Sequence, residues 1–258
     1  MPRWPSPVPK RAAANEHTLR LAPKEFPLAQ GRGGVTRAVF FDVDFTLIYP
    51  GPRFQASGYY DFCARHGIEV DPALFDSAVA GAASGLDTGD DTYDAQLYVD
   101  YTRRIIEGMG GRGAAVDIVA REIYDEWAAC RHFTLYDDVP DVLRTLHASG
   151  VKIGLISNSH RCLTSFETHF QLRGLFTVAV SSIEHGYMKP HPSIFEAALR
   201  GVGVPASESV MVGDNLTHDV EGARRLGMRG VLVSRSGPVA APPDVPVIQS
   251  LRELPALL

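Results

Sequence analysis

The chain has 258 residues, of which 45% are hydrophobic and 21% charged, and its formal net charge at pH 7 is −5. This composition can bury a sizeable core, which excludes collagen-like, coiled-coil and largely disordered proteins. No apolar run reaches the roughly 18 to 20 residues that a membrane-spanning helix needs. A soluble protein with no membrane partner is therefore expected.

Residues 1–37 are rich in proline and carry seven Lys or Arg against two Glu. They lack the apolar segment of a secretory signal, and we expect a flexible basic arm. A transit peptide or a nucleic-acid-binding tail would also be basic. Serines are few and the positive charges are scattered, so a solvated arm is favoured and no nucleic-acid partner is expected. Three widely spaced cysteines without a CxxC pair favour a reducing, cytoplasmic location.

A continuous apolar run at residues 38–41 stops abruptly at Asp42, and similar runs recur along the chain. The later runs are residues 152–156, 178–180, 210–212 and 231–233. Unbroken apolar runs are typical of strands that helices cover on both faces. Helical spacing between them, as in Val139, Leu143 and Leu146, predicts a Rossmann-like three-layer α/β sandwich with a parallel sheet.

The alternation of strands and helices is interrupted over residues 49–138, which show helical spacings and no strand-like run. This stretch is too long for a loop, so we expect an inserted helical cap domain in a core formed by residues 38–48 and 139–258. The cap carries sixteen Asp and Glu against seven Arg, which is nearly all the excess negative charge. Its segment 108–113 matches the spacing GxGxxG, but a helical pattern precedes it. We therefore expect a turn between helices and no dinucleotide site.

Polar residues stand where the predicted strands end, at Asp42, Asp44, Ser157 and Asp214. In parallel sheets ligands bind beyond the carboxyl ends of the strands, so these side chains are expected to form one cluster. Carboxylates this close repel each other and need a cation or a shared proton. Oxygen ligands without a Cys or His cluster favour Mg²⁺. Each residue alone would be read as a helix cap or a turn residue, and only their order and shared location favour a site.

Four ordered motifs extend this pattern: Asp42-Val43-Asp44-Phe45-Thr46, Ser157, Lys189-Pro190, and Gly213-Asp214 followed by Asp219. They resemble the sequence motifs of the haloacid dehalogenase superfamily, and the flanking segments 188–195 and 219–228 are also similar to that family's. The resemblance covers the core. It implies a hydrolase fold in which the helical insertion after the first motif is a cap of the family's C1 type.

By this resemblance, Asp42 would be the nucleophile and would form an aspartyl phosphate. Asp44 would protonate the departing alcohol and then deprotonate the hydrolytic water. Thr46 would orient that pair, Ser157 would hydrogen-bond the phosphoryl oxygens, and Lys189 would offset their charge. Since general acid–base catalysis supplies roughly 10²–10⁴-fold, most of the acceleration must come from covalent catalysis, positioning and fixed positive charge.

The resemblance also implies a metal site. Mg²⁺ would be held by the side chains of Asp42 and Asp214 and by the backbone carbonyl of Asp44. Asp219 would support the site by aligning Lys189. The other supporting residues would be Asn158 and Asn215.

The acid at Asp44 favours phosphate ester hydrolysis, because members of the family that displace halide lack an acidic residue at this position. We therefore expect a Mg²⁺-dependent phosphatase for small-molecule phosphate monoesters, as a monomer or homodimer. Two alternatives stay open. A phosphoryl-transferring mutase would share every core motif, and a non-catalytic regulatory protein would share the fold, although the intact motif residues argue against it.

In this family, specificity resides in the cap and in the segment after the first motif. The residues expected to line the entrance are Phe45, Tyr49, Arg53 and Tyr59. Phe45 departs from the glycine that is common at its position, and its ring could restrict the turn or form part of the pocket floor. The polar loop 87–94 is expected as solvated acidic surface. If it faced the site, polyols or amines would be favoured over polyanions.

Overall fold

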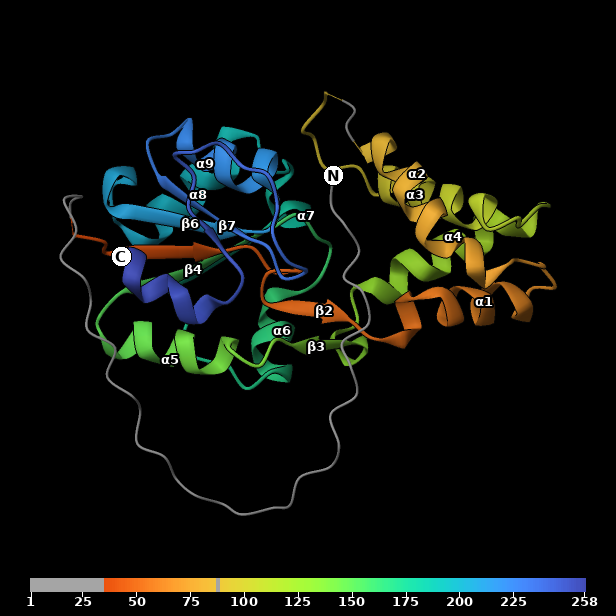
Figure 1. Ribbon diagram of the computed structural model, residues 1–258, viewed down its shortest axis with the longest axis horizontal. Helices are drawn as coiled ribbons and strands as arrows, with labels where there is room; N and C mark the ends of the chain where they lie inside the picture. The colour runs from red at the N-terminus through yellow and green to blue at the C-terminus, as the bar shows by residue number, and fades with distance from the viewer. Residues whose placement is uncertain (1–34, 87–88) are drawn as a thin grey trace, which may run out of the picture.

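The computed structural model describes residues 35–86 and 89–258. It contains a core built on a β-sheet and, to one side of that sheet, a group of helices joined to it by a short two-stranded ribbon (Figure 1). The predicted basic arm lies outside the described residues except for residues 35–37. No helix among the described residues is long and apolar enough to cross a membrane.

The core sheet has six strands in the order β5-β4-β1-β6-β7-β8, and all neighbouring strands are parallel. The strands are β1 (Ala38–Phe41), β4 (Lys152–Ser157), β5 (Val178–Ser181), β6 (Ser209–Gly213), β7 (Arg229–Val233) and β8 (Val247–Ile248). The predicted parallel sheet and its five apolar runs are confirmed. The edge strand β8 is only two residues long, too short for a hydrophobic pattern to reveal it.

The two faces of β1 explain the three layers. Val39 and Phe41 belong to a hydrophobic cluster with α5 (Val139–Ala148) and α6 (Leu163–His169). The alternate residues Ala38 and Phe40 pack instead with α8 (Pro192–Val202) and α9 (Gly222–Arg224). Successive side chains of a strand point to opposite faces, so a strand covered on both sides must be apolar at every position.

The described part of the inserted segment, called the cap below, contains four α-helices that lie beside the core (Figure 1). They are α1 (Ala56–Arg65), α2 (Phe75–Ala82), α3 (Ala95–Gly108) and α4 (Ala115–Trp127). Helix α3 packs against both α2 and α4. The glycine-rich segment 108–113 forms the turn between α3 and α4, as expected. The element directly before it is the helix α3 and not a strand.

The remaining helices are short. They are α7 (Ser182–His185), the π-helix η6 (Leu216–Glu221) and the 3₁₀ helices η1 (Pro52–Phe54), η2 (Pro72–Leu74), η3 (Ala83–Leu86), η4 (Cys130–His132), η5 (Ala206–Glu208) and η7 (Leu251–Leu257). The stretch around Val220 is a π-helical turn continued by α9. It begins where the Asn215 side chain accepts a hydrogen bond from the His218 amide at 2.9 Å.

An antiparallel ribbon connects the cap to the core. It pairs β2 (Ile48–Pro50) with β3 (Phe133–Leu135), so the chain enters and leaves the cap side by side. The sequence pattern does not predict this ribbon, because each strand has only three residues and Pro50 stands in one of them.

A buried ion pair fixes the core end of this connection. Asp138 Oδ2 accepts hydrogen bonds from Arg235 Nη1 at 2.6 Å, Ser250 Oγ at 2.7 Å and the Leu251 amide at 2.7 Å. Arg235 also donates to the Thr46 carbonyl at 2.7 Å. Burial alone would raise the pKa of Asp138, but Arg235 and these hydrogen bonds hold it below its ordinary value. The pair therefore links the segment that follows β3, where the chain returns from the cap, to the loop after β1.

The cap also contacts the core directly. The Met188 amide donates to the Asp91 carbonyl at 2.7 Å, and the Tyr93 amide donates to the Gly186 carbonyl at 3.0 Å. The part of the acidic loop that the structure describes thus pairs with the core segment immediately before Lys189. It does not line the cavity that opens at the carboxylates.

Candidate active site

Three adjacent strands bring the predicted polar residues together. Because β1 lies between β4 and β6, the chain segments that follow these strands emerge at the same edge of the sheet. Carboxylate oxygens of Asp42, Asp214 and Asp219 lie within 4.8 Å of one another. Asp42 lies far from Asp214 and Asp219 in the sequence, so the order of the strands in the sheet is what brings these side chains together.

Lys189 is the centre of the cluster. Its buried Nζ donates to Asp42 Oδ1 and to Asp219 Oδ1, each at 2.6 Å. The Asn158 side chain holds the lysine's backbone from both sides, donating to its carbonyl at 2.8 Å and accepting from its amide at 2.7 Å. Asn158 therefore fixes where the lysine ammonium can point.

Asp219 has both carboxylate oxygens engaged. One accepts from Lys189, and the other accepts from the Asn215 amide at 2.9 Å. The side chain is almost fully buried. This arrangement fits a residue that positions Lys189 better than one that holds a metal directly.

Negative charge is in excess at this edge of the sheet. Burial raises the pKa of Asp42, against the attraction of Lys189. Burial, together with Asp42 and Asp219, raises the pKa of Asp214 well above its ordinary value. For Lys189, the two carboxylates outweigh burial and raise its pKa.

The residues present fit a hard divalent cation. Asp42 and Asp214 offer carboxylate oxygens, and Asp214 has no Lys or Arg within ion-pair distance in the described chain. Oxygen donors with surplus negative charge are what Mg²⁺ prefers. A bound cation would offset the burial and the mutual repulsion that raise these pKa values.

Asp44 is held away from the other carboxylates by a residue that the sequence prediction missed. Arg161 Nη1 donates to Asp44 Oδ1 at 2.9 Å and to Oδ2 at 3.0 Å, and Nη2 donates to the Trp127 carbonyl of the cap at 2.8 Å. Arg161 is fully buried. Burial raises the pKa of Asp44, with Arg161 opposing the shift.

The loop after Asp44 is tight. Phe45 has φ +63°, a left-handed conformation that favours glycine, and its amide donates to the Ile48 carbonyl at 2.7 Å. The glycine common at this position therefore has a steric reason. Thr46 is fully buried, and its hydroxyl has no hydrogen-bond partner in the described part of the chain. Ser157, also buried, ends β4 beside this loop.

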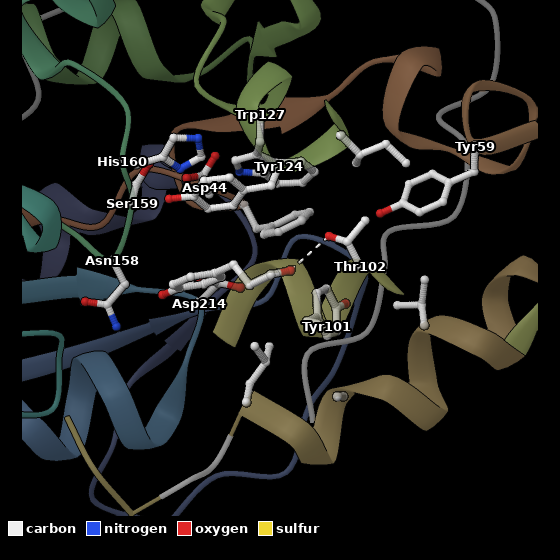
Figure 2. Close-up of a pocket in the computed structure, with 16 residues that line it drawn as sticks. Asp44, Tyr59, Tyr101, Thr102, Tyr124, Trp127, Asn158, Ser159, His160 and Asp214 are labelled. Carbon is white, nitrogen blue, oxygen red and sulfur yellow. Dashed lines mark hydrogen bonds between the residues drawn. The ribbon is translucent and has the colours of Figure 1, made fainter. Parts of the chain in front are cut away.

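A cavity of about 210 Å³ opens beside the carboxylates and extends into the cap. Its lining residues are Asp44, Phe45, Tyr59, Val79, Ala83, Leu86, Tyr98, Tyr101, Thr102, Ile123, Tyr124, Trp127, Asn158, Ser159, His160 and Asp214. Figure 2 shows Asp214 and Asn158 at one side, Tyr59 at the other, and aromatic rings between them. The core thus contributes the charged end and the cap the aromatic end.

Two of the four residues predicted at the entrance line the cavity, namely Phe45 and Tyr59. Tyr49 does not, because it lies in β2 and packs against Tyr136 at 4.9 Å between ring centroids. Arg53 does not either, because its guanidinium pairs with Glu126 at 3.2 Å and stacks over the Phe62 ring at 3.6 Å. Nearness in sequence to Asp42 does not identify the residues that line the cavity, because the chain leaves the site along β2.

Sequence reasoning missed most of the cap's share of the cavity. Tyr98 and Tyr101 stand three residues apart on α3, and Tyr124 and Trp127 do so on α4. Such spacing is the pattern of a core-facing helix stripe, so it does not separate cavity residues from packed ones.

Comparison with known proteins agrees with the fold and the motifs. The family model "haloacid dehalogenase-like hydrolase" matches residues 36–227. The chain is 34% identical over 234 residues to N-acylneuraminate-9-phosphatase of Homo sapiens, covering 86% of this chain and 93% of that protein. It is 30% identical over 242 residues to haloacid dehalogenase-like hydrolase domain-containing protein 3 of Danio rerio, covering 86% and 96%.

Solved structures show the same architecture. The HAD-hydrolase YfnB from Bacillus subtilis superposes with a TM-score of 0.68 at 17% identity, covering 85% of this chain and 97% of that one. Since the family model spans most of the chain and the relatives match it nearly end to end, the protein belongs to the haloacid dehalogenase-like hydrolase family.

Proposed function

We propose that this protein is a Mg²⁺-dependent phosphatase that hydrolyses small-molecule phosphate monoesters through an aspartyl phosphate on Asp42. The observation that carries the proposal is the Asp42–Lys189–Asp219 ion-pair cluster, set beside a second acid, Asp44, at the mouth of a cavity. A relative sharing about a third of its residues is named a phosphatase, which supports the same reaction class.

In the first step, a carboxylate oxygen of Asp42 attacks phosphorus, and the bond from phosphorus to the ester oxygen breaks. Asp44 gives its proton to the departing oxygen, and its raised pKa favours the protonated form that this requires. Lys189, held against Asp42, places a fixed positive charge where the phosphoryl oxygens would lie. Ser157, at the end of the adjacent strand, would donate a hydrogen bond to the same oxygens.

In the second step, Asp44 takes a proton from water, the water oxygen attacks phosphorus, and the bond to Asp42 breaks to release phosphate. Arg161 keeps Asp44 in place between the two steps. Asp42, Asp214 and the Asp44 carbonyl would hold Mg²⁺, which would supply further positive charge for the phosphoryl group.

Phosphate release from a broad panel of phosphate monoesters tests the proposal. The assay compares the unmodified protein with Asp42→Asn, each with Mg²⁺ and with a chelator. We expect Mg²⁺-dependent turnover that falls on the order of 10⁴-fold or more in the variant, since loss of a nucleophile removes the covalent route.

Equal activity of Asp42→Asn would contradict the nucleophile assignment. Isomerisation of sugar phosphates without phosphate release would favour the mutase. Absence of Mg²⁺-dependent turnover on the whole panel would favour the non-catalytic alternative.

A further inference from the structure

The cavity in the cap has the chemistry of an apolar binding site. Its wall carries the rings of Phe45, Tyr98, Tyr101, Tyr124 and Trp127. His160 stacks on Tyr124 with ring centroids 4.0 Å apart and an interplanar angle of 15°, which extends the flat aromatic surface toward Asp44 (Figure 2). Such surfaces bind planar or aliphatic groups by stacking and by exclusion of water.

The tyrosine hydroxyls of this wall are largely engaged by the protein itself. Tyr98 donates to Met188 Sδ at 3.1 Å, and the hydroxyls of Tyr124 and Tyr93 lie 2.6 Å apart. The Tyr59 hydroxyl bonds the Thr102 side chain, which in turn donates to the Tyr98 carbonyl at 3.0 Å. His160 Nε2 is buried without a partner among the described residues and is one of few polar atoms left to a ligand. A polyol placed here would therefore bury more hydroxyls than it finds partners for, and each buried unpaired hydroxyl is costly.

The charged side chains that line the cavity also favour an apolar group. Among the described residues that line the cavity there are two aspartates and no Lys or Arg. A leaving group with a carboxylate or a second phosphate would therefore meet no cation in the cap. This leaves uncharged, apolar groups as the best match.

The size of the cavity limits the group that fits. An apolar cavity of roughly 150 Å³ is known to hold benzene. The 210 Å³ here includes the space beside Asp44 and Asp214, where the phosphoryl group would lie. One aromatic ring, or an aliphatic group of similar volume, fills what remains.

From these observations we propose that the substrates are phosphate monoesters of uncharged alcohols or phenols that carry about one aromatic ring or an equivalent apolar group. This inference rests on the proposed phosphatase function and names its substrate class. The cap determines specificity through stacking and through the shortage of free polar groups.

The test compares 2-phenylethyl phosphate with glycerol 3-phosphate, because both release primary alcohols and the intrinsic difference in leaving group is small. Burial of one ring predicts a preference of roughly 10–100-fold in kcat/KM for the phenylethyl ester. Binding of 2-phenylethylphosphonate, which has no ester bond to hydrolyse, is measured by calorimetry on the same protein. It reports on the cavity independently of turnover.

A matched pair of variants locates the effect. Ala83→Phe fills the cavity from its wall, whereas Ala80→Phe adds the same ring to the exposed side of α2. We expect Ala83→Phe to lower kcat/KM for the phenylethyl ester, and affinity for the phosphonate, by at least about tenfold. Activity on glycerol 3-phosphate should fall by a clearly smaller factor, because its leaving group fills less of the cavity, and Ala80→Phe should leave both substrates unaffected.

Equal or better hydrolysis of glycerol 3-phosphate by the unmodified protein would overturn this inference and leave the phosphatase proposal intact. A parallel loss on both substrates in Ala83→Phe would also overturn it. If no ester is hydrolysed, the phosphatase proposal fails, and the phosphonate affinities alone decide whether the cavity binds apolar groups.

Discussion

Two buried carboxylate clusters in this protein differ in how their charge is balanced. At the cap connection, Asp138 faces Arg235, one anion against one cation, and its pKa is lowered. At the sheet edge, three carboxylates stand against one cation: Lys189 pairs with Asp42 and Asp219, Asp214 lies beside them, and the pKa values of Asp42 and Asp214 are raised. The first cluster stabilises the fold as it stands. The second keeps an excess of buried negative charge, which is a feature expected of a functional site.

Among the variants that separate these two clusters, Asp214→Asn should have the largest effect. Turnover should fall by about 10³-fold or more, because the change removes a metal carboxylate. With a chelator present, the variant should unfold at a higher temperature than the unmodified protein, since a buried charge that its neighbours repel is gone. Kinetic assays and thermal unfolding at neutral pH measure the two effects together.

The pH dependence of that stability gain has a definite sign. The raised pKa of Asp214 makes its charge destabilising above the folded pKa, and the penalty disappears as the pH falls below the ordinary value of 3.8. The advantage of Asp214→Asn should therefore shrink on acidification. A variant that is less stable than the unmodified protein in chelator would contradict the comparison of the two clusters.

Asp138→Asn should destabilise the protein, whereas Asp214→Asn should stabilise it in chelator. Removal of one partner from this buried pair is expected to cost about 3–5 kcal/mol of unfolding free energy. Because the folded pKa of Asp138 is lowered, its contribution is fully present above the ordinary value of 3.8 and is lost as the pH falls through the lower folded value. Denaturant unfolding at several pH values checks this.

The second measurement on Asp138→Asn is its turnover at temperatures below its unfolding transition. We expect kcat to stay within a few-fold of the unmodified protein, since Asp138 does not line the cavity. A large loss of kcat in the folded variant, with stability unchanged, would show that the Asp138–Arg235 pair takes part in the chemistry.

The smallest expected effect is that of Phe45→Gly. Glycine relieves the strain of the left-handed conformation at φ +63°, which is worth about 1–2 kcal/mol. It also makes the unfolded backbone more flexible and removes the ring that faces Trp127, with ring centroids 6.4 Å apart. The net change in stability should be under about 1 kcal/mol. The preference for an apolar leaving group should drop a few-fold, as substrate pairs would reveal. Destabilisation by several kcal/mol would show that the ring chiefly supports the fold.

The sequence predicts the charged end of the cavity better than the aromatic end. Asp42 and Asp214 end apolar runs, and strand order in a parallel sheet brings such ends together, so local pattern and topology agree. Tyr98 and Trp127 lie on helix faces whose spacing is the same whether they pack or line a cavity. Arg161, four residues after Ser157, is a buried arginine whose partner lies far away in the chain, and no local pattern marks it.

The most direct measurement traps the covalent step. In Asp44→Asn, p-nitrophenyl phosphate provides a leaving group that departs without a proton, whereas the hydrolytic water has lost its base. Mass spectrometry after rapid mixing with Mg²⁺ and this ester should find one phosphoryl group on the protein, located on Asp42. Absence of the adduct while the unmodified protein turns over, or its location on another residue, would contradict the account.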